Sequence, residues 1–192
     1  MSVDDQQLID EFLQGNAEAF DHLVLRYQDR LYNTLFRMFN SEQDALDAAQ
    51  EAFVQAFQKL HTFQGKSKFY SWLCRIAINN VLSQKRKRKL KTASLDTVKE
   101  KAGVEPDDDN RSSQPSHQLE TTENQSAILM ALNELAEEQR TVIVLKEIDG
   151  LKYEEIAEII DCPVGTVRSR IHRARTELRL KLQSLWDENL DG

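Results

Sequence analysis

The sequence predicts an all-α protein made of two small helical domains joined by a flexible acidic linker. Its 192 residues include only 6 glycines and 3 prolines, too few for the many tight turns of a β fold. Apolar residues recur at helical spacings of three and four on both sides of a polar stretch. That stretch, residues 93–126, has little apolar periodicity, which indicates a flexible linker. We therefore expect domains at 1–92 and 127–186, and a short tail at 187–192.

Composition excludes several classes of protein. The net charge of -7 argues against a protein that simply coats nucleic acid, although it leaves room for local basic surfaces. No apolar run approaches the roughly 20 residues of a membrane span, and the acidic N-terminus lacks the apolar core of a secretory signal. Cys74 and Cys162 have no Cys or His at ligand spacing. We expect them to be reduced thiols of a cytosolic protein and expect no metal site.

Positive charge is concentrated at the ends of the two domains. Residues 84–101 contain 8 basic and 2 acidic side chains, and residues 163–182 contain 6 basic and 1 acidic. The rest of each domain is acidic. Because clustered Lys and Arg neutralise phosphates, both stretches are candidate nucleic-acid contacts.

Four helices are expected in the N-terminal domain. The first ends near Gly15, Asn16 is expected to cap the second, and Ser41 to cap the third with Asp44 three residues on. The fourth begins near Phe69. The apolar stripe of the first helix is Leu8, Ile9, Phe12 and Leu13, and that of the second is Phe20, Leu23, Val24, Tyr27, Leu31 and Leu35.

The third helix has two contrasting faces. One carries small and aromatic residues and is expected to lie in the core: Ala45, Ala49, Ala52, Phe53, Ala56 and Phe57. The opposite face carries Asp47, Gln50, Glu51, Val54 and Gln58. Spacing alone favours an ordinary solvated face here, with a partner surface as the alternative.

The fourth helix and the loop before it suit single-stranded nucleic acid. Trp72, Arg75, Asn79 and Arg86 share one side, and the helix runs into the sequence KRKRK. Aromatic rings stack on unpaired bases, and cations neutralise phosphates. The loop, residues 63–69, adds aromatics, lysines and a glycine. Alternatively, Trp72 and the phenylalanines belong to the core and the basic run only solubilises a helix end.

The C-terminal domain contains a helix-turn-helix pattern. Ile128, Leu132 and Leu135 indicate one helix, and residues 142–148 a second, which ends at the Asp149-Gly150 break. A third helix at 153–160, a turn at 161–163 and a longer helix from 164 to about 185 form the motif.

The last helix has the features of a major-groove recognition helix. Its inward stripe is Val167, Ile171, Ala174, Leu178, Leu182 and Leu185. The opposite face carries Ser169, His172, Arg173 and Thr176, with further arginines beside it. Arg binds guanine edges, and Ser, Thr and His reach bases or phosphates. The alternative is a surface helix with incidental arginines.

Three segments closely resemble the extracytoplasmic-function (ECF, group 4) sigma factors of bacterial RNA polymerase, in the sigma-70 family: DALDAAQEAFVQAFQKL, FQGKSKFYSWLCRIAINNV and GLKYEEIAEIIDCPVGTVRSRIHRARTEL. They cover most of the chain outside the linker. The resemblance implies sigma regions 2 and 4, and a cytoplasmic protein without enzymatic activity, cofactor or small-molecule substrate. Such a protein directs transcription initiation, often in a stress or envelope response. Implied partners are core polymerase (β′ clamp helices and β flap), promoter DNA and an anti-sigma factor, with no direct membrane insertion.

The resemblance also implies roles for individual residues. Those implied to dock on core polymerase are Asp47, Gln50, Glu51, Phe53, Val54 and Gln58. Those implied to read and melt the minus-ten element are Phe63, Gly65, Lys66, Ser67, Lys68, Phe69, Trp72, Arg75, Asn79, Asn80 and Arg86. Those implied to read the minus-thirty-five element as duplex are Thr166, Arg168, Ser169, His172, Arg173 and Thr176.

This chain departs from the family pattern at three places. Lys152 stands where a Ser cap is common, a loss of about 1 kcal/mol, and Ala136 replaces a common Pro. Asp161 stands where Gly is common, but Asp tolerates positive φ, so the turn is expected to form. The competing hypotheses are a stand-alone helix-turn-helix regulator, which leaves the N-terminal domain unexplained, and a nuclease, for which no His/Asp/Glu cluster is visible.

Overall fold

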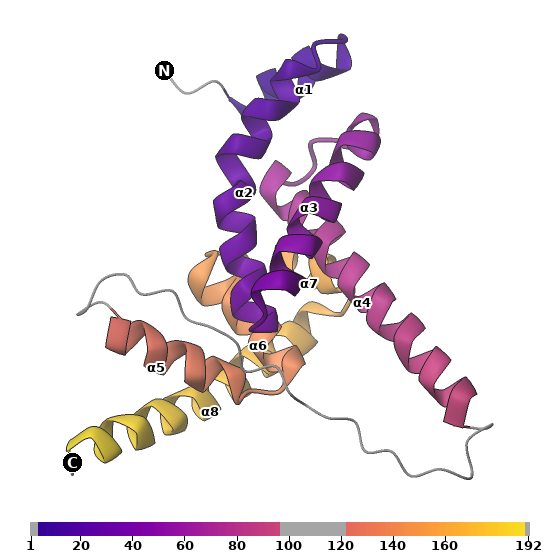
Figure 1. Cartoon of the computed structure of the whole chain (residues 1–192). Helices are drawn as coiled ribbons and strands as arrows, with labels where there is room; N and C mark the ends of the chain where they lie inside the picture. The colour runs from indigo at the N-terminus through magenta and orange to yellow at the C-terminus, as the bar shows by residue number, and fades with distance from the viewer. Residues whose placement is uncertain (1–3, 97–121, 191–192) are drawn as a thin grey trace.

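The computed structural model describes residues 4–96 and 122–190 and confirms the all-α fold: within these ranges every regular element is helical (Figure 1). The N-terminal domain comprises α1 (Asp5–Leu13), α2 (Glu18–Phe39), α3 (Glu42–Lys59), the short helix η1 (Leu60–Thr62) and α4 (Phe69–Asp96). The C-terminal domain comprises α5 (Thr122–Asn133), α6 (Glu137–Ile143), the π-helical turn η2 (Val144–Ile148), α7 (Tyr153–Ile160) and α8 (Val164–Leu190).

Two predicted helix caps have different outcomes. The Ser41 hydroxyl accepts a hydrogen bond from the Asp44 backbone N–H at 3.2 Å, which confirms the cap of α3. The prediction that Asn16 caps α2 is wrong. The helix begins after Ala17 without a side-chain cap, and the Asn16 amide instead donates to the Glu11 carboxylate at 3.4 Å. The Asn16 side chain is thus bonded to a charged acceptor at the end of α1 rather than to the backbone of α2.

The N-terminal core forms where α3 packs between α2 and α4. The alanine face of α3 is buried as predicted, and small side chains let its neighbours approach closely. Leu23, Leu31 and Leu35 of α2 and Leu73 of α4 are fully buried beside it. The burial of Phe57 is less complete than predicted. Its ring contacts Phe12 and Phe20 at centroid distances of 5.0 and 5.3 Å, yet the residue is 46% exposed at the end of the bundle.

The second helix of the C-terminal domain is longer than predicted and irregular. It begins at Glu137 rather than 142, and residues 144–148 form a π-helical turn. The Asp149 N–H donates to the Val144 carbonyl at 3.1 Å, and Gly150 then takes a positive φ of 69°. A π turn adds a residue to the helical register, as often occurs at functional positions. Here it directs Asp149 out of the domain.

The helices extend into the stretch predicted as linker. Residues 93–96 belong to α4 and residues 122–126 to α5, while residues 97–121 lie outside the described part of the chain. The lysine, leucine and alanine residues after KRKRK are good helix formers, which explains the continuation of α4. α8 likewise continues beyond the predicted 185 to Leu190.

The two domains pack against each other, which the sequence did not indicate. One cluster of buried apolar residues runs through both. α7 lies on α4, and η2 contacts α2. In Figure 1, α2 and α3 rise above a base formed by α6, α7 and α8. Residues of the predicted minus-ten surface therefore face the C-terminal domain.

The two cysteines differ in environment, which gives a testable prediction. Cys74 is buried, and burial raises the pKa of its thiol to about 12 despite an opposing hydrogen bond with Tyr70. Cys162 is partly exposed at the turn before α8. Because the thiolate is the reactive form, iodoacetamide at pH 8 should modify one thiol of the native protein, Cys162, and both thiols in denaturant. Rapid modification of both in the native protein would contradict this packing.

Candidate DNA- and polymerase-binding surfaces

The predicted polymerase-docking face lies on the outer side of α3. Asp47, Gln50, Glu51, Val54 and Gln58 are all exposed. Gln43 and Gln55 donate hydrogen bonds of 2.8 Å to the Asp47 and Glu51 carboxylates, which fixes the two acids along the helix. Phe53, also predicted to dock, is half-buried and packs against the core. The face is acidic with an apolar residue at its centre.

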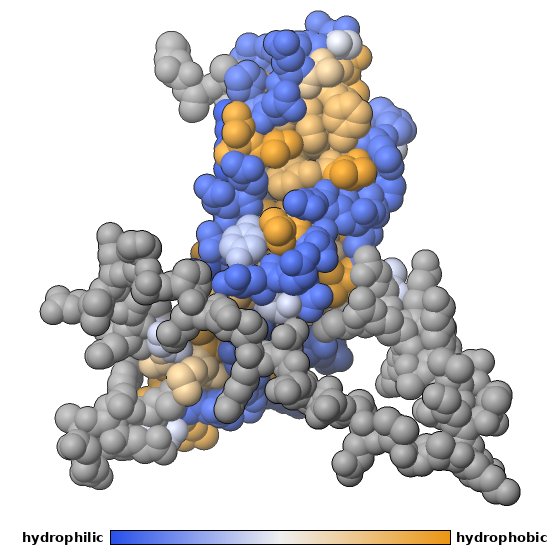
Figure 2. Space-filling model, in the orientation of Figure 1, coloured by the Kyte–Doolittle hydropathy of each residue, from blue (hydrophilic) through white to orange (hydrophobic). Residues whose placement is uncertain are grey.

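Apolar surface missed by the sequence reasoning adjoins this face. Figure 2 shows apolar residues gathered on the upper part of the molecule, around α1 and α3. Val54 is 52% exposed and Leu13 is 50% exposed, beside the half-exposed Phe57. The helical spacing of apolar residues predicted that Leu13 and Phe57 point into the core. Spacing within one helix could not show that these two side chains lie at the end of the bundle, where no other helix covers them.

Three aromatic rings form the base of the predicted minus-ten surface. Trp72 packs on Phe63 and Phe69 at centroid distances of 5.3 and 5.8 Å and is half-buried. Phe69 is only 2% exposed. Its predicted DNA contact therefore needs correction: in this structure Phe69 is a core residue that supports the other two rings, because the start of α4 turns its side chain inward.

The polar residues of this surface separate into two groups. Arg75 and Asn79 are exposed on one side of α4, and the preceding loop exposes Lys66 and Lys68, with Gly65 at φ 67° and Ser67 half-buried. Asn80 points elsewhere. It lines a cavity between α3 and α6 with Asp47, Glu51 and Arg140, and its buried Nδ2 has no hydrogen-bond partner among the described residues. The side chain of Arg86 is not among those that the structure describes.

Helix α8 presents the predicted recognition face to solvent. Val167, Ile171 and Ala174 are buried, and the opposite side exposes the predicted contacts Arg168, Ser169, His172, Arg173 and Thr176, with Thr166 half-buried. The Ser169 and Thr176 hydroxyls donate to backbone carbonyls within the helix at 2.9 and 3.0 Å.

Two arginines beside this face form ion pairs with glutamates of neighbouring helices. Arg170 pairs with Glu138 at 2.5 Å, and Arg175 with Glu147 at 2.6 Å. Exposed pairs of this kind contribute about 0–1 kcal/mol each, but they fix α8 against α6 and η2. The Arg173 guanidinium has no hydrogen bond to any residue in the described ranges, so it is available to a ligand.

The unusual positions around the helix-turn-helix motif are accommodated. Lys152 provides no side-chain cap, but the Glu155 carboxylate accepts from the Lys152 backbone N–H at 2.8 Å, which retains half of a capping box. Asp161 adopts the left-handed conformation with φ 52°, which confirms the predicted turn. Ala136 precedes α6 as its N-cap residue without a side-chain bond.

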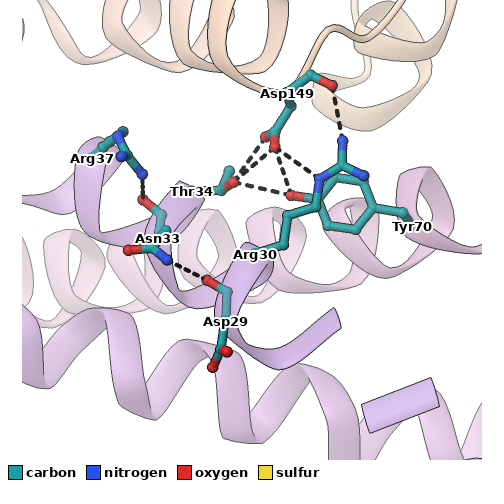
Figure 3. Close-up of polar contacts among 7 residues, drawn as sticks. All are labelled: Asp29, Arg30, Asn33, Thr34, Arg37, Tyr70 and Asp149. Carbon is teal, nitrogen blue, oxygen red and sulfur yellow. Dashed lines mark hydrogen bonds and ion pairs between the residues drawn. The ribbon is translucent and has the colours of Figure 1, made fainter. Parts of the chain in front are cut away.

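A buried polar cluster joins the domains (Figure 3). The Asp149 carboxylate accepts hydrogen bonds from the Thr34 hydroxyl at 2.9 and 3.0 Å and from the Tyr70 hydroxyl at 2.9 Å. The Arg30 guanidinium lies 3.8 Å above the Tyr70 ring and donates to the Asp149 carbonyl at 2.9 Å. Burial, with the neighbouring Cys74 and Asp149, raises the pKa of Tyr70 well above its ordinary value, so its hydroxyl stays protonated. Sequence reasoning identified Asp149 only as a helix break.

The fold and these faces define a two-domain helical protein suited to binding both DNA and a protein partner. Residues 23–91 match the family model "Sigma-70 region 2", and residues 125–178 match "Sigma-70, region 4". The chain belongs to the sigma-70 family of RNA polymerase sigma factors and is of the ECF type.

Relatives match the chain along almost its full length. It is 39% identical to RNA polymerase sigma-H factor of Pseudomonas aeruginosa, covering 96% of each chain. It is 38% identical to ECF RNA polymerase sigma-E factor of Escherichia coli K12, covering 94% of this chain and 95% of that protein.

Solved structures show the same fold. The sigma factor RpoE of Bartonella quintana, in complex with the anti-sigma factor NepR, matches with TM-score 0.65 and 28% identity over 85% of this chain and 96% of that one. CnrH, in complex with the cytosolic domain of CnrY, matches with TM-score 0.64 and 27% identity over 94% of this chain and 97% of that one.

Two features are absent from the part of the chain that the structure describes. Within residues 4–96 and 122–190, none of the helices combines the length and the hydrophobicity that a membrane span requires. No group of three or more His, Cys, Asp or Glu side chains is placed to hold a metal ion.

Proposed function

We propose that this sigma factor works without catalytic activity of its own, in the cytoplasm, by joining core RNA polymerase and gripping two elements of a promoter. The observation that carries the proposal is the separation of three surfaces: the acidic and apolar face of α3, the aromatic and basic face of α4, and the exposed arginine face of α8. A stand-alone helix-turn-helix regulator uses only the last of these.

Each surface suits one task. The outer face of α3 docks on the β′ clamp helices, while the C-terminal domain contacts the β flap. Phe63, Trp72, Arg75 and the loop lysines hold the opened non-template strand, because rings stack on bases and cations contact phosphates. α8 enters the major groove at the minus-thirty-five element. Two weak DNA contacts tied to one enzyme gain affinity through effective concentration.

An anti-sigma factor is a further partner. One similar solved structure is a complex of the sigma factor RpoE with the anti-sigma factor NepR, and another is a complex of CnrH with the cytosolic domain of CnrY. The half-exposed Leu13 and Phe57 extend the apolar surface beyond the predicted polymerase contacts, which offers such a protein additional area.

Retention on immobilised core polymerase tests the proposal. The full chain should be retained and should be displaced by a competing sigma factor, since both use the same docking site. The isolated chain should bind promoter duplex only weakly at physiological salt, in keeping with its charge of -7. Flow-through from the polymerase column together with tight specific duplex binding would favour the stand-alone regulator.

Trp72→Ala separates strand capture from duplex docking. In the polymerase-bound complex we expect the rate of promoter opening, followed by permanganate reactivity of unpaired thymines, to fall about 5- to 150-fold, since stacking contributes about 1–3 kcal/mol per base. Duplex docking, measured in the cold before opening, should change little. Because Trp72 also packs on Phe63 and Phe69, Trp72→Phe is the control that keeps a ring in place. Equal loss of docking and opening would make Trp72 structural.

A further inference from the structure

Helix α1 borders the predicted minus-ten surface, although the match to sigma-70 region 2 does not include it and begins only at residue 23. A cavity of about 400 Å³ is lined by the first turn of α1, by the loop at 63–69 and by the start of α4, with residues 149–151 on its other side. Ligand pockets have volumes of roughly 300–1,000 Å³. The cavity therefore has room for one nucleobase beside the loop.

Gln6 is the α1 residue that meets this loop. Its amide oxygen lies 3.5 Å from the position that a Cβ would take on Gly65, where the backbone turns with φ 67°. Its amide nitrogen donates to the Asp10 carboxylate at 2.9 Å, which orients the side chain and leaves the oxygen as an acceptor. Asp4 and Asp5 line the same wall. The α1 side of the cavity is therefore rich in hydrogen-bond acceptors.

Asp5 anchors α1 to the rest of the N-terminal domain. Its carboxylate accepts hydrogen bonds from the Tyr27 hydroxyl and the Arg26 guanidinium of α2. Burial and the Asp5 carboxylate raise the pKa of Tyr27 to about 12, so the hydroxyl stays protonated and donates at neutral pH. The Tyr27 ring packs on Phe69 and on Tyr70, each at a centroid distance of 5.6 Å. Tyr27 thus connects α1 to the aromatic rings that support the loop.

We propose that α1 completes the base-binding pocket of this loop, with Gln6 accepting a hydrogen bond from the exocyclic amino group of one unpaired base. Asp5 and Tyr27 are positioning residues that hold α1 against the loop. The inference rests on the proposed function, because it takes the loop as the place where the opened strand is held. Adenine and cytosine carry such an amino group where thymine carries a carbonyl oxygen. An acceptor-rich wall therefore selects an amino-bearing base at one position of the strand.

Gln6→Ala and Gln7→Ala form a matched pair of variants. Both glutamines are exposed on α1, and each donates to a carboxylate four residues on, Gln6 to Asp10 and Gln7 to Glu11. Of the two, only Gln6 is among the described residues that line the cavity. Alanine is a strong helix former, so both variants should fold.

Tyr27→Phe and Tyr32→Phe form a second pair, which tests the anchor. Tyr27→Phe removes the hydroxyl that donates to Asp5 and keeps the ring. Tyr32 is a half-buried tyrosine of the same helix that stacks on Phe36, and it is not among the described residues of the cavity wall. Circular dichroism of each variant checks that the helices are retained.

Selection from pre-opened DNA is the measurement. Core polymerase joined to each chain binds DNA whose unpaired non-template segment has random sequence, and the retained strands are sequenced. With the parent chain, one position should favour adenine or cytosine over thymine. Gln6→Ala should lower that preference about 2- to 12-fold, the range expected for one hydrogen bond, and should leave the other positions unchanged. Tyr27→Phe should lower it at the same position, while Gln7→Ala and Tyr32→Phe should match the parent.

Two pairs of bases at the favoured position identify the group that is read. 5-Methylcytosine and thymine differ in the amino group and the neighbouring ring proton, and adenine and purine differ in the amino group alone. The parent should bind the amino-bearing member of one pair more tightly, which identifies the base as cytosine or adenine. Gln6→Ala should bind both members of that pair alike.

Four outcomes would contradict the inference. A parent without any preference for an amino-bearing base, or an unchanged preference in folded Gln6→Ala, would overturn it. Equal weakening at every position in Gln6→Ala would make α1 merely structural. An unchanged preference in folded Tyr27→Phe would overturn the anchoring role. Lack of retention of the parent on core polymerase, measured beforehand, is distinguishable from these results and would overturn the proposed function and this inference with it.

Discussion

Arg173→Ala is expected to weaken promoter binding by the polymerase-bound chain by about 1–3 kcal/mol, roughly 5- to 150-fold. Arg173 lies on the exposed face of α8, and no described residue occupies its guanidinium, so its donors are available to a base edge. The loss should disappear on a template whose minus-thirty-five element is scrambled. Footprinting or filter binding on the two templates measures both quantities.

Arg179→Ala is the control for Arg173→Ala. It removes the same charge from an exposed position farther along α8, beyond the N-terminal part that enters the groove. A phosphate contact at Arg173 would weaken binding to both templates alike and lower the salt dependence. Unchanged promoter choice in Arg173→Ala would remove it from the recognition face.

Glu51→Lys is expected to reduce affinity for core polymerase about tenfold or more, because placing like charges at a charged interface costs several kcal/mol. Glu51 is exposed on α3 and held toward the docking face by Gln55. Titration of labelled chain with core polymerase measures the effect. The affinity should recover in part at high salt, since the loss is electrostatic.

Asp29→Lys is the control for Glu51→Lys. It makes the same change of charge at an exposed position of α2, away from the docking face. An equal loss of affinity in both variants would mean that only the overall charge matters. Normal affinity of Glu51→Lys would show that the outer face of α3 is solvated rather than a partner surface.

Local patterns predicted most of the helices and the burial of the core. The alternation of alanines and charges identified both faces of α3, and the Ser41 cap and the Asp161 turn were found because each depends on residues close in sequence. The spacing in α8 separated its buried stripe from its arginine face, which required no knowledge of neighbouring elements. Such features follow from helix geometry alone.

The missed features all depend on contacts between segments distant in sequence. Phe69 and Phe57 are both aromatic, but Phe69 is buried and Phe57 is half-exposed. This difference depends on where the helix bundle ends, which the spacing of residues within one helix does not show. Asp149 meets Thr34, 115 residues away, because the π turn redirects it. Periodicity cannot predict which surfaces of two domains meet.

Mapping transcript starts most directly tests the claim that this chain directs polymerase to promoters. Core polymerase is reconstituted with the full chain and genomic template, and the 5′ ends of the RNA are sequenced. We predict a defined set of starts that share two upstream elements and are absent with core polymerase alone. Starts identical with and without the chain would contradict the account.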